Sequence, residues 1–272
     1  DVQPGTTYTE ADLDFGVTYG VEFVEIVGGK NLTREEMEEA SEAVNAFHFM
    51  RVEDVDYQKG DDEDGRNVYF AVTGRGPGRG TYNDWGTVYK LELDDDSPMS
   101  GKLTQIISGN TDTNNQDGNL ALLQSPDNIC VTENFIYTQE DPNSFSRGHT
   151  AYIYQSDLNG GSIQPVLEFV IRPDLAKDGS ITTPGSTSEG EFDRDSGEYG
   201  ALIDISDKIG EPNTFMLALQ PHYWESVEFE AIDGDDLRTR PDAISAAQQR
   251  EGFSPREDDQ GSQIVLLKGL PR

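Results

Sequence analysis

Short runs of β-branched and aromatic residues, separated by Gly, Asp, Asn and Pro, recur along most of this chain of 272 residues. Runs of this kind are typical of short β-strands joined by tight turns. None of them approaches the length of about 18 apolar residues that a membrane-spanning helix requires. The sequence therefore predicts an all-β fold with no membrane span.

The predicted strands fall into three groups, at about 68–108, 127–171 and 200–269. Repeated sheets of three or four antiparallel strands are typical of the blades of a β-propeller, and a β-sandwich is the alternative. A propeller has about four to eight blades, so three groups do not close a ring. The segment VTYGVEFVEI (17–26) is predicted to give a strand to a fourth group. We therefore expect residues 1–272 to form one partial β-propeller domain of about three to four blades, completed by other polypeptide.

One stretch, NLTREEMEEASEAVNAF (31–47), has the pattern of a helix. Thr33 followed by Glu36 forms a capping-box sequence at its start. Apolar residues then recur at spacings of three and four, as one buried helix face requires: Met37, Ala40, Val44 and Phe47. We predict one helix near 32–47, inserted among the strands, and a weaker one at 240–250.

The charge is strongly acidic, with Asp+Glu 52 against Lys+Arg 20 and a formal net charge of -32. Such a surface disfavours binding to nucleic acid and attracts cations, divalent ions most strongly. An acidic shell without specific sites is the alternative. The single cysteine, Cys130, excludes an internal disulfide and lies in an apolar run, where a free Cys usually behaves as a small buried hydrophobe.

The segment FHFMRVEDVDY (47–57) carries an arginine and a glutamate two residues apart. In an extended segment Arg51 and Glu53 point to the same side. The guanidinium of Arg51 is suited to bind two oxygens of a phosphate, and the carboxylate of Glu53 to hold a hard cation that bridges to the same phosphate. The alternative is an ordinary ion pair at the start of a strand.

A predicted hairpin turning at residues 133–134 has polar pairs at both of its ends. Asp127 and Asn128 precede its first strand, and Glu140 and Asp141 end its second. In an antiparallel hairpin these ends lie side by side, so the four groups are expected to converge. Oxygen ligands favour Ca²⁺ or Mg²⁺ over zinc or copper. The alternative is that Asp and Asn here only form turns.

The motifs RVED, VYFAVTG, GTVYKLEL, SPDNI and QEDP occur in this order, followed by TFMLALQPH and GSQIVLLKG. This order resembles the later part of the PhoX-type alkaline phosphatases. The resemblance runs from about residue 47 to 140, with a looser part at 214–268. It implies a six-bladed propeller that is secreted, periplasmic or extracellular and uses iron and calcium to hydrolyse phosphomonoesters.

Carried over by position, the resemblance implies that Arg51 contacts substrate phosphate and that Glu53 binds calcium. Asp127 and Glu140 match acidic positions near the metal centre. The cysteine that bridges iron in the family lies upstream of the arginine motif, and Cys130 is in the wrong place to substitute for it. The expectation is therefore Ca²⁺, with Fe³⁺ only where an upstream segment or a partner subunit completes the site.

Two other functions remain open at the level of sequence. One is a non-catalytic acidic module that binds calcium and serves a structural or interaction role. The other is a different calcium-dependent propeller hydrolase, because a ligand set made of oxygens does not separate these classes.

Overall fold

The structure is a computed structural model of the chain, and it describes residues 8–60, 66–77, 82–97, 99–111, 117–142, 147, 149–169, 197–220, 225–226, 253–254 and 263–272. The chain divides into two compact units. The first unit comprises Asp1–Thr138, Gln155–Gln164 and Arg272, and the second comprises Gln139–Tyr154 and Pro165–Pro271. The predicted helix at 240–250 lies outside the described residues.

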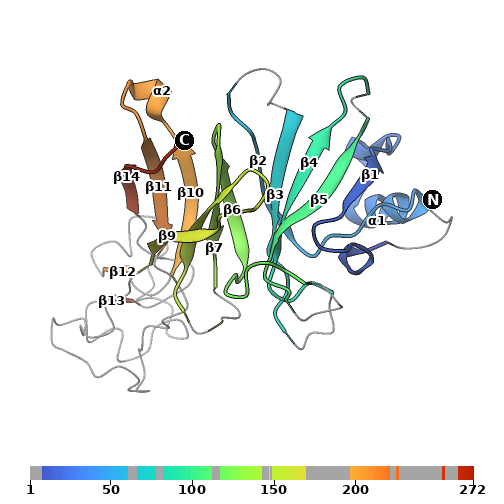
Figure 1. The fold of residues 1–272 in the computed structure, drawn as a ribbon. Helices are drawn as coiled ribbons and strands as arrows, with labels where there is room; N and C mark the ends of the chain where they lie inside the picture. Colours follow the sequence, from blue (N-terminus) through green and yellow to red (C-terminus); the bar gives the residue numbers. More distant parts are fainter. Residues whose placement is uncertain are drawn as a thin grey trace. The chain divides into compact units, whose positions relative to one another are not determined.

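The first unit contains an antiparallel five-stranded sheet in the order β1-β5-β4-β3-β2 (Figure 1). Its strands are β1 (Thr18–Glu22), β2 (Val52–Tyr57), β3 (Asn67–Val72), β4 (Thr87–Leu93) and β5 (Ser100–Ser108). The prediction that 17–26 supplies a fourth group is wrong, because β1 pairs with β5 and extends this first sheet. Thr18 and Thr104, which face each other in that pair, also join their hydroxyl groups at 2.8 Å.

The remaining strands form a four-stranded sheet in the order β6-β7-β8-β9, a three-stranded sheet β10-β11-β14 and a two-stranded pair β12-β13. Their bounds are Pro126–Val131 (β6), Phe135–Glu140 (β7), Tyr152–Asp157 (β8), Gln164–Glu168 (β9), Glu198–Asp204 (β10), Thr214–Gln220 (β11), Glu225–Ser226 (β12), Phe253–Ser254 (β13) and Gln263–Lys268 (β14). The hairpin predicted at residues 133–134 is confirmed, since the Thr132 N–H donates to the Phe135 carbonyl at 2.9 Å.

The predicted helix is confirmed as α1 (Arg34–Ala43), and the capping box is formed in both directions between Thr33 and Glu36. The predicted apolar face is the less exposed one, with Met37 and Ala40 partly buried, but the helix has no fully buried residue and ends at Ala43. The chain then reaches Asn45, whose φ of 53° is left-handed and incompatible with a continued helix. The other helical turns are η1 (Glu10–Asp12), η2 (Gly29–Asn31) and α2 (Ser206–Ile209).

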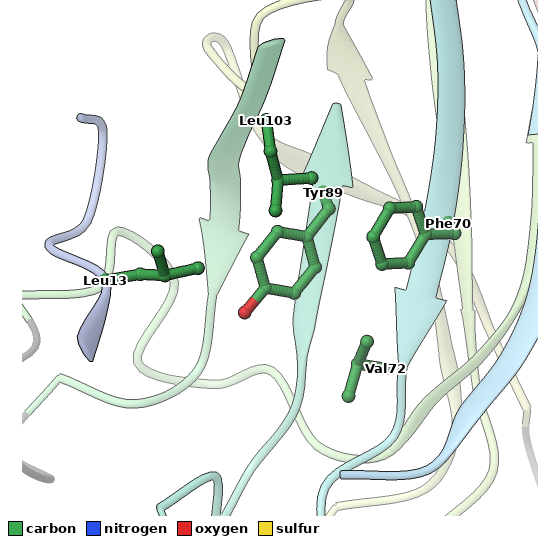
Figure 2. Close-up of a cluster of buried hydrophobic side chains, with 5 residues drawn as sticks. All are labelled: Leu13, Phe70, Val72, Tyr89 and Leu103. Atoms are coloured by element: carbon green, nitrogen blue, oxygen red, sulfur yellow. The ribbon is translucent and has the colours of Figure 1, made fainter. Parts of the chain in front are cut away.

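One apolar cluster of the first unit lies on the five-stranded sheet (Figure 2) and consists of Leu13, Phe70, Val72, Tyr89 and Leu103. The rings of Phe70 and Tyr89 stack with centroids 5.0 Å apart. Phe47 and Phe49 pack against this cluster from the segment that precedes β2. This cluster therefore packs β3 and β4 against the segment that leads into β2.

Within the described residues the structure is mostly β-sheet, which confirms the predicted all-β class at this level. None of the helices in that part of the chain has the length and apolar character needed to cross a membrane.

Candidate functional site

Arg51 stands immediately before β2 in a left-handed backbone conformation, with φ 70°. Two hydrogen bonds from the end of β3 fix the chain on either side of it. The Thr73 N–H donates to the Arg51 carbonyl at 3.0 Å, and the Gly74 N–H donates to the Met50 carbonyl at 3.1 Å. Residues other than glycine rarely adopt this conformation, and they cluster at functional sites where the surroundings over-determine it.

The Arg51 side chain turns back on its own strand. Its Nη2 lies 3.1 Å from Oε1 of Glu53, and its Nη1 donates to the Gly74 carbonyl at 3.5 Å. The side chains of Arg51 and Glu53 are 41% and 34% exposed, so both remain open to solvent. The structure thus brings the two predicted residues together, in the ion pair that the sequence also allowed.

Asp127, at the start of β6, joins the same corner through Thr73. The Thr73 hydroxyl donates to Asp127 Oδ1 at 3.3 Å, while the Asn128 side chain donates to Oδ2 at 3.1 Å. We call Arg51, Glu53, Thr73, Gly74 and Asp127 the Arg51 corner. It gathers three of the four predicted site residues at the start of β2, the end of β3 and the start of β6.

Two further carboxylates of β2 connect this strand to β6. Asp54 accepts the N–H of Val55 through Oδ1 at 2.8 Å and the N–H of Ile129 through Oδ2 at 3.0 Å. Asp56 likewise accepts the N–H of its own neighbour Tyr57 at 2.9 Å and that of Val131 at 2.8 Å. This carboxylate ladder satisfies backbone donors of two strands at once and holds β6 in place beside the Arg51 corner.

Behind the Arg51 corner lies a buried carboxylate that the sequence analysis missed. Glu10 is 1% exposed, and its carboxylate accepts hydrogen bonds. Its donors include the Met50 N–H at 2.8 Å, the Asn83 side-chain amide at 2.9 Å and the Tyr89 hydroxyl at 2.7 Å. The only local signal was TEAD (9–12), a capping box that predicts the turn η1 but not the direction of the Glu10 side chain.

Burial dominates the titration of this network. Desolvation raises the pKa of Glu10, although the hydrogen bonds from Tyr89, Met50 and Asn83 act in the opposite direction. Burial, and then the charge of Glu10, raise the pKa of Tyr89 well above its ordinary value. Tyr89 therefore stays protonated and donates to the carboxylate throughout the physiological range.

Glu140, the fourth predicted site residue, ends β7 and belongs to the second unit. Its carboxylate is fully buried, accepts the Tyr152 N–H at 2.9 Å and lies 3.8 Å from Nδ1 of His149. The His149 ring stacks on the ring of Tyr152, with centroids 4.4 Å apart. Because Asp127 belongs to the first unit, its convergence with Glu140 stays a prediction.

Tyr154 lies in the same part of the second unit, with its ring edge-on to that of Tyr152. Burial, and then the charge of Glu140, raise the pKa of Tyr154. Burial, followed by Glu168 and Glu140, also raises the pKa of Tyr152. Both hydroxyls therefore remain neutral near Glu140, which makes this a buried polar cluster of acid, imidazole and phenol groups.

In the part of the chain that the structure describes, no group of three or more His, Cys, Asp or Glu side chains is placed to hold a metal ion. Cys130 is buried in β6, as predicted from its apolar run. Comparison with protein-family profiles, with curated proteins and with solved structures gave no match.

Proposed function

We propose that the Arg51 corner binds the phosphate of a phosphomonoester, and that the chain is the later part of a PhoX-like metal-dependent phosphomonoester hydrolase. The observation that supports this proposal best is the left-handed Arg51, fixed by hydrogen bonds on both sides and carrying a half-exposed guanidinium. Strain retained in an ordered backbone is a reason to look for function at that residue.

The guanidinium of Arg51 offers a planar fork that matches two phosphate oxygens. Its present partners are Glu53 and the Gly74 carbonyl, and the pair with Glu53 is solvent-exposed and therefore weak. A phosphate dianion can displace such a partner, after which Glu53 is released to bind a cation. Thr73, whose N–H donates to the Arg51 carbonyl, donates its hydroxyl to Asp127.

A calcium ion takes six to eight oxygen ligands, often including substrate or water oxygens. The corner supplies the carboxylates of Glu53 and Asp127, which fit the chemistry of this ion but complete only part of its shell. We propose that these two residues hold Ca²⁺ together with the bound phosphate. The ion would supply positive charge to the phosphoryl oxygens. Iron enters the proposal only with ligands from upstream polypeptide or a partner subunit.

A second function is favoured by the closeness of Arg51 and Glu53. If the 3.1 Å pair is permanent, the corner is structural, and the chain is an acidic calcium-binding module that interacts with other polypeptide. For either function we propose a partial β-propeller whose remaining blades are completed from outside this chain.

Binding of inorganic phosphate separates the two functions. We would titrate the intact chain with phosphate by calorimetry, with and without calcium, and compare wild type with Arg51→Lys. Lysine keeps the charge but loses the fork, so phosphate affinity should fall about tenfold or more. Arg66→Lys is the matched control, because Arg66 is 45% exposed and also paired with a carboxylate, that of Asp95.

Phosphate binding that depends on Arg51 but not on Arg66, and that strengthens with calcium, supports the hydrolase. Release of p-nitrophenol from its phosphate ester, measured on the same samples with added iron and calcium, then tests the reaction. Calcium binding without any phosphate binding would reject the hydrolase and leave the acidic module.

A further inference from the structure

In the part of the chain that the structure describes, three bonds to other backbone groups and one bond to a side chain hold the backbone of the segment 48–51. The His48 N–H donates to the Tyr8 carbonyl at 2.9 Å, and the end of β3 donates to the Met50 and Arg51 carbonyls. The fourth bond runs from the Met50 N–H to Oε2 of Glu10 at 2.8 Å. It lies in the peptide group next to the one that enters Arg51, where the backbone becomes left-handed.

The pocket around the Glu10 carboxylate contains converging donors: Met50 N–H, the Asn83 side-chain amide and the Tyr89 hydroxyl. A carboxylate only accepts hydrogen bonds and can satisfy all three. A glutamine of the same shape would turn its own NH₂ group toward one of these donors. The hydrogen-bonding pattern therefore fits two acceptor oxygens, although burial by itself disfavours the charged form.

The other contacts of this network are equally fixed. Gln105 donates to the Tyr89 hydroxyl at 3.2 Å, and the Asn83 carbonyl oxygen accepts the Gly86 N–H at 2.8 Å and the Asn110 side-chain amide at 2.8 Å. Because each neighbour of Glu10 is held by a further partner, the carboxylate has little freedom to follow Met50 if the segment moves.

We infer that Glu10 is a positioning residue for the anion site: by accepting the Met50 N–H, its buried carboxylate keeps Arg51 in the left-handed conformation that presents the guanidinium at the corner. The role assigned to Arg51 rests on the proposed function. The backbone part of the inference, from Glu10 through Met50 to Arg51, does not depend on it.

The backbone part is tested by NMR on the intact chain, through the Cα and Cβ shifts of Arg51, which distinguish left-handed from right-handed residues. Wild type should show a left-handed Arg51 and a slowly exchanging, downfield Met50 amide. Glu10→Gln should move Arg51 away from the left-handed shifts. Tyr89→Phe removes a different donor from the same carboxylate, leaves the Met50 bond in place, and should keep them.

The anion part is tested by titrating the same proteins with inorganic phosphate at fixed pH and ionic strength. Glu10→Gln should weaken phosphate binding about tenfold, the effect of one charge-assisted hydrogen bond. Ile136→Val serves as the stability control, because Ile136 is a fully buried apolar residue of β7. It should lower the melting temperature without changing phosphate affinity.

The outcomes separate the two proposals. An unchanged Arg51 in Glu10→Gln, or a rapidly exchanging Met50 amide in wild type, would overturn the positioning role whatever the phosphate result. Absence of phosphate binding in wild type, with Arg51 still shifted by Glu10→Gln, would overturn the proposed function and leave the positioning role of Glu10 standing. The Met50 measurement needs only wild-type protein, so it decides even if Glu10→Gln does not fold.

Discussion

The carboxylate ladder between β2 and β6 gives a sharp prediction for Asp54→Ala. This substitution removes the acceptor of two N–H groups, those of Val55 and Ile129. Val55 is 60% exposed, so water can replace its partner at little cost. Ile129 is 4% exposed, and its N–H would be left without its carboxylate.

The magnitude follows from the Ile129 bond. A hydrogen bond to a charged group contributes about 1.5–3 kcal/mol, and a buried donor left unmade costs a similar amount. We therefore expect Asp54→Ala to lower the free energy of unfolding by about 2 kcal/mol. For a chain of this size that corresponds to a loss of about 4–8 °C in melting temperature.

Hydrogen exchange is the assay of choice because it reports on single amides. In Asp54→Ala the Ile129 amide should exchange much faster, while the Val131 amide, which donates to Asp56, should keep most of its protection. Asp95→Ala is the control: its side chain is 82% exposed, and we expect a change below about 0.5 kcal/mol. Equal protection of Ile129 in wild type and Asp54→Ala would refute the reasoning.

Three further predictions concern the interior. Burial raises the pKa of the Glu10 carboxyl above 4.5, so the folded chain keeps the carboxyl proton at pH values where the unfolded chain has lost it. The free energy of unfolding of wild type, relative to that of Glu10→Gln, should therefore fall as pH rises above 4.5. A flat or rising difference in urea unfolding would contradict this. Gly86→Ala would place a Cβ 2.1 Å from Pro126 Cδ at a φ of 97°, and should lower the free energy of unfolding by about 3 kcal/mol or more. Gly16→Ala is the control: its Cβ meets nothing within 4 Å, and it should cost about 1 kcal/mol. Equal melting temperatures of the two variants would exclude the clash. Cys130 is 3% exposed and should react with a thiol reagent only after unfolding, whereas fast labelling of native protein would show that β6 opens.

The strands were largely predictable because their signal is local. The run at 86–93, for example, became β4 (Thr87–Leu93), and 101–108 became β5 (Ser100–Ser108). The helix was predictable at its start, where Thr33 caps it, but not at its end. The apolar spacing continues to Phe47 because that residue packs on the core from a loop, so periodicity alone placed it wrongly on the helix.

The candidate site was also predictable only in part. The closeness of Arg51 and Glu53 was predicted from their spacing of two residues, but the sequence did not indicate that Arg51 is left-handed rather than extended. The alternating Asp54 and Asp56 were visible too, but nothing local indicates that their partners are amides of β6. The role of Glu10 depends entirely on contacts between distant segments, which a pattern within one segment cannot report.

Those contacts also set the order in which the corner can be assembled. The donors to Glu10 lie 40, 73 and 79 residues further along the chain. During synthesis the Glu10 carboxylate therefore remains solvated until β4 has emerged and Tyr89 can reach it. Contacts of this sequence separation slow folding, since a long loop must close before they are gained. Arg51 is thus expected to acquire its left-handed conformation only after β3 has formed and Glu10 has gained these distant donors.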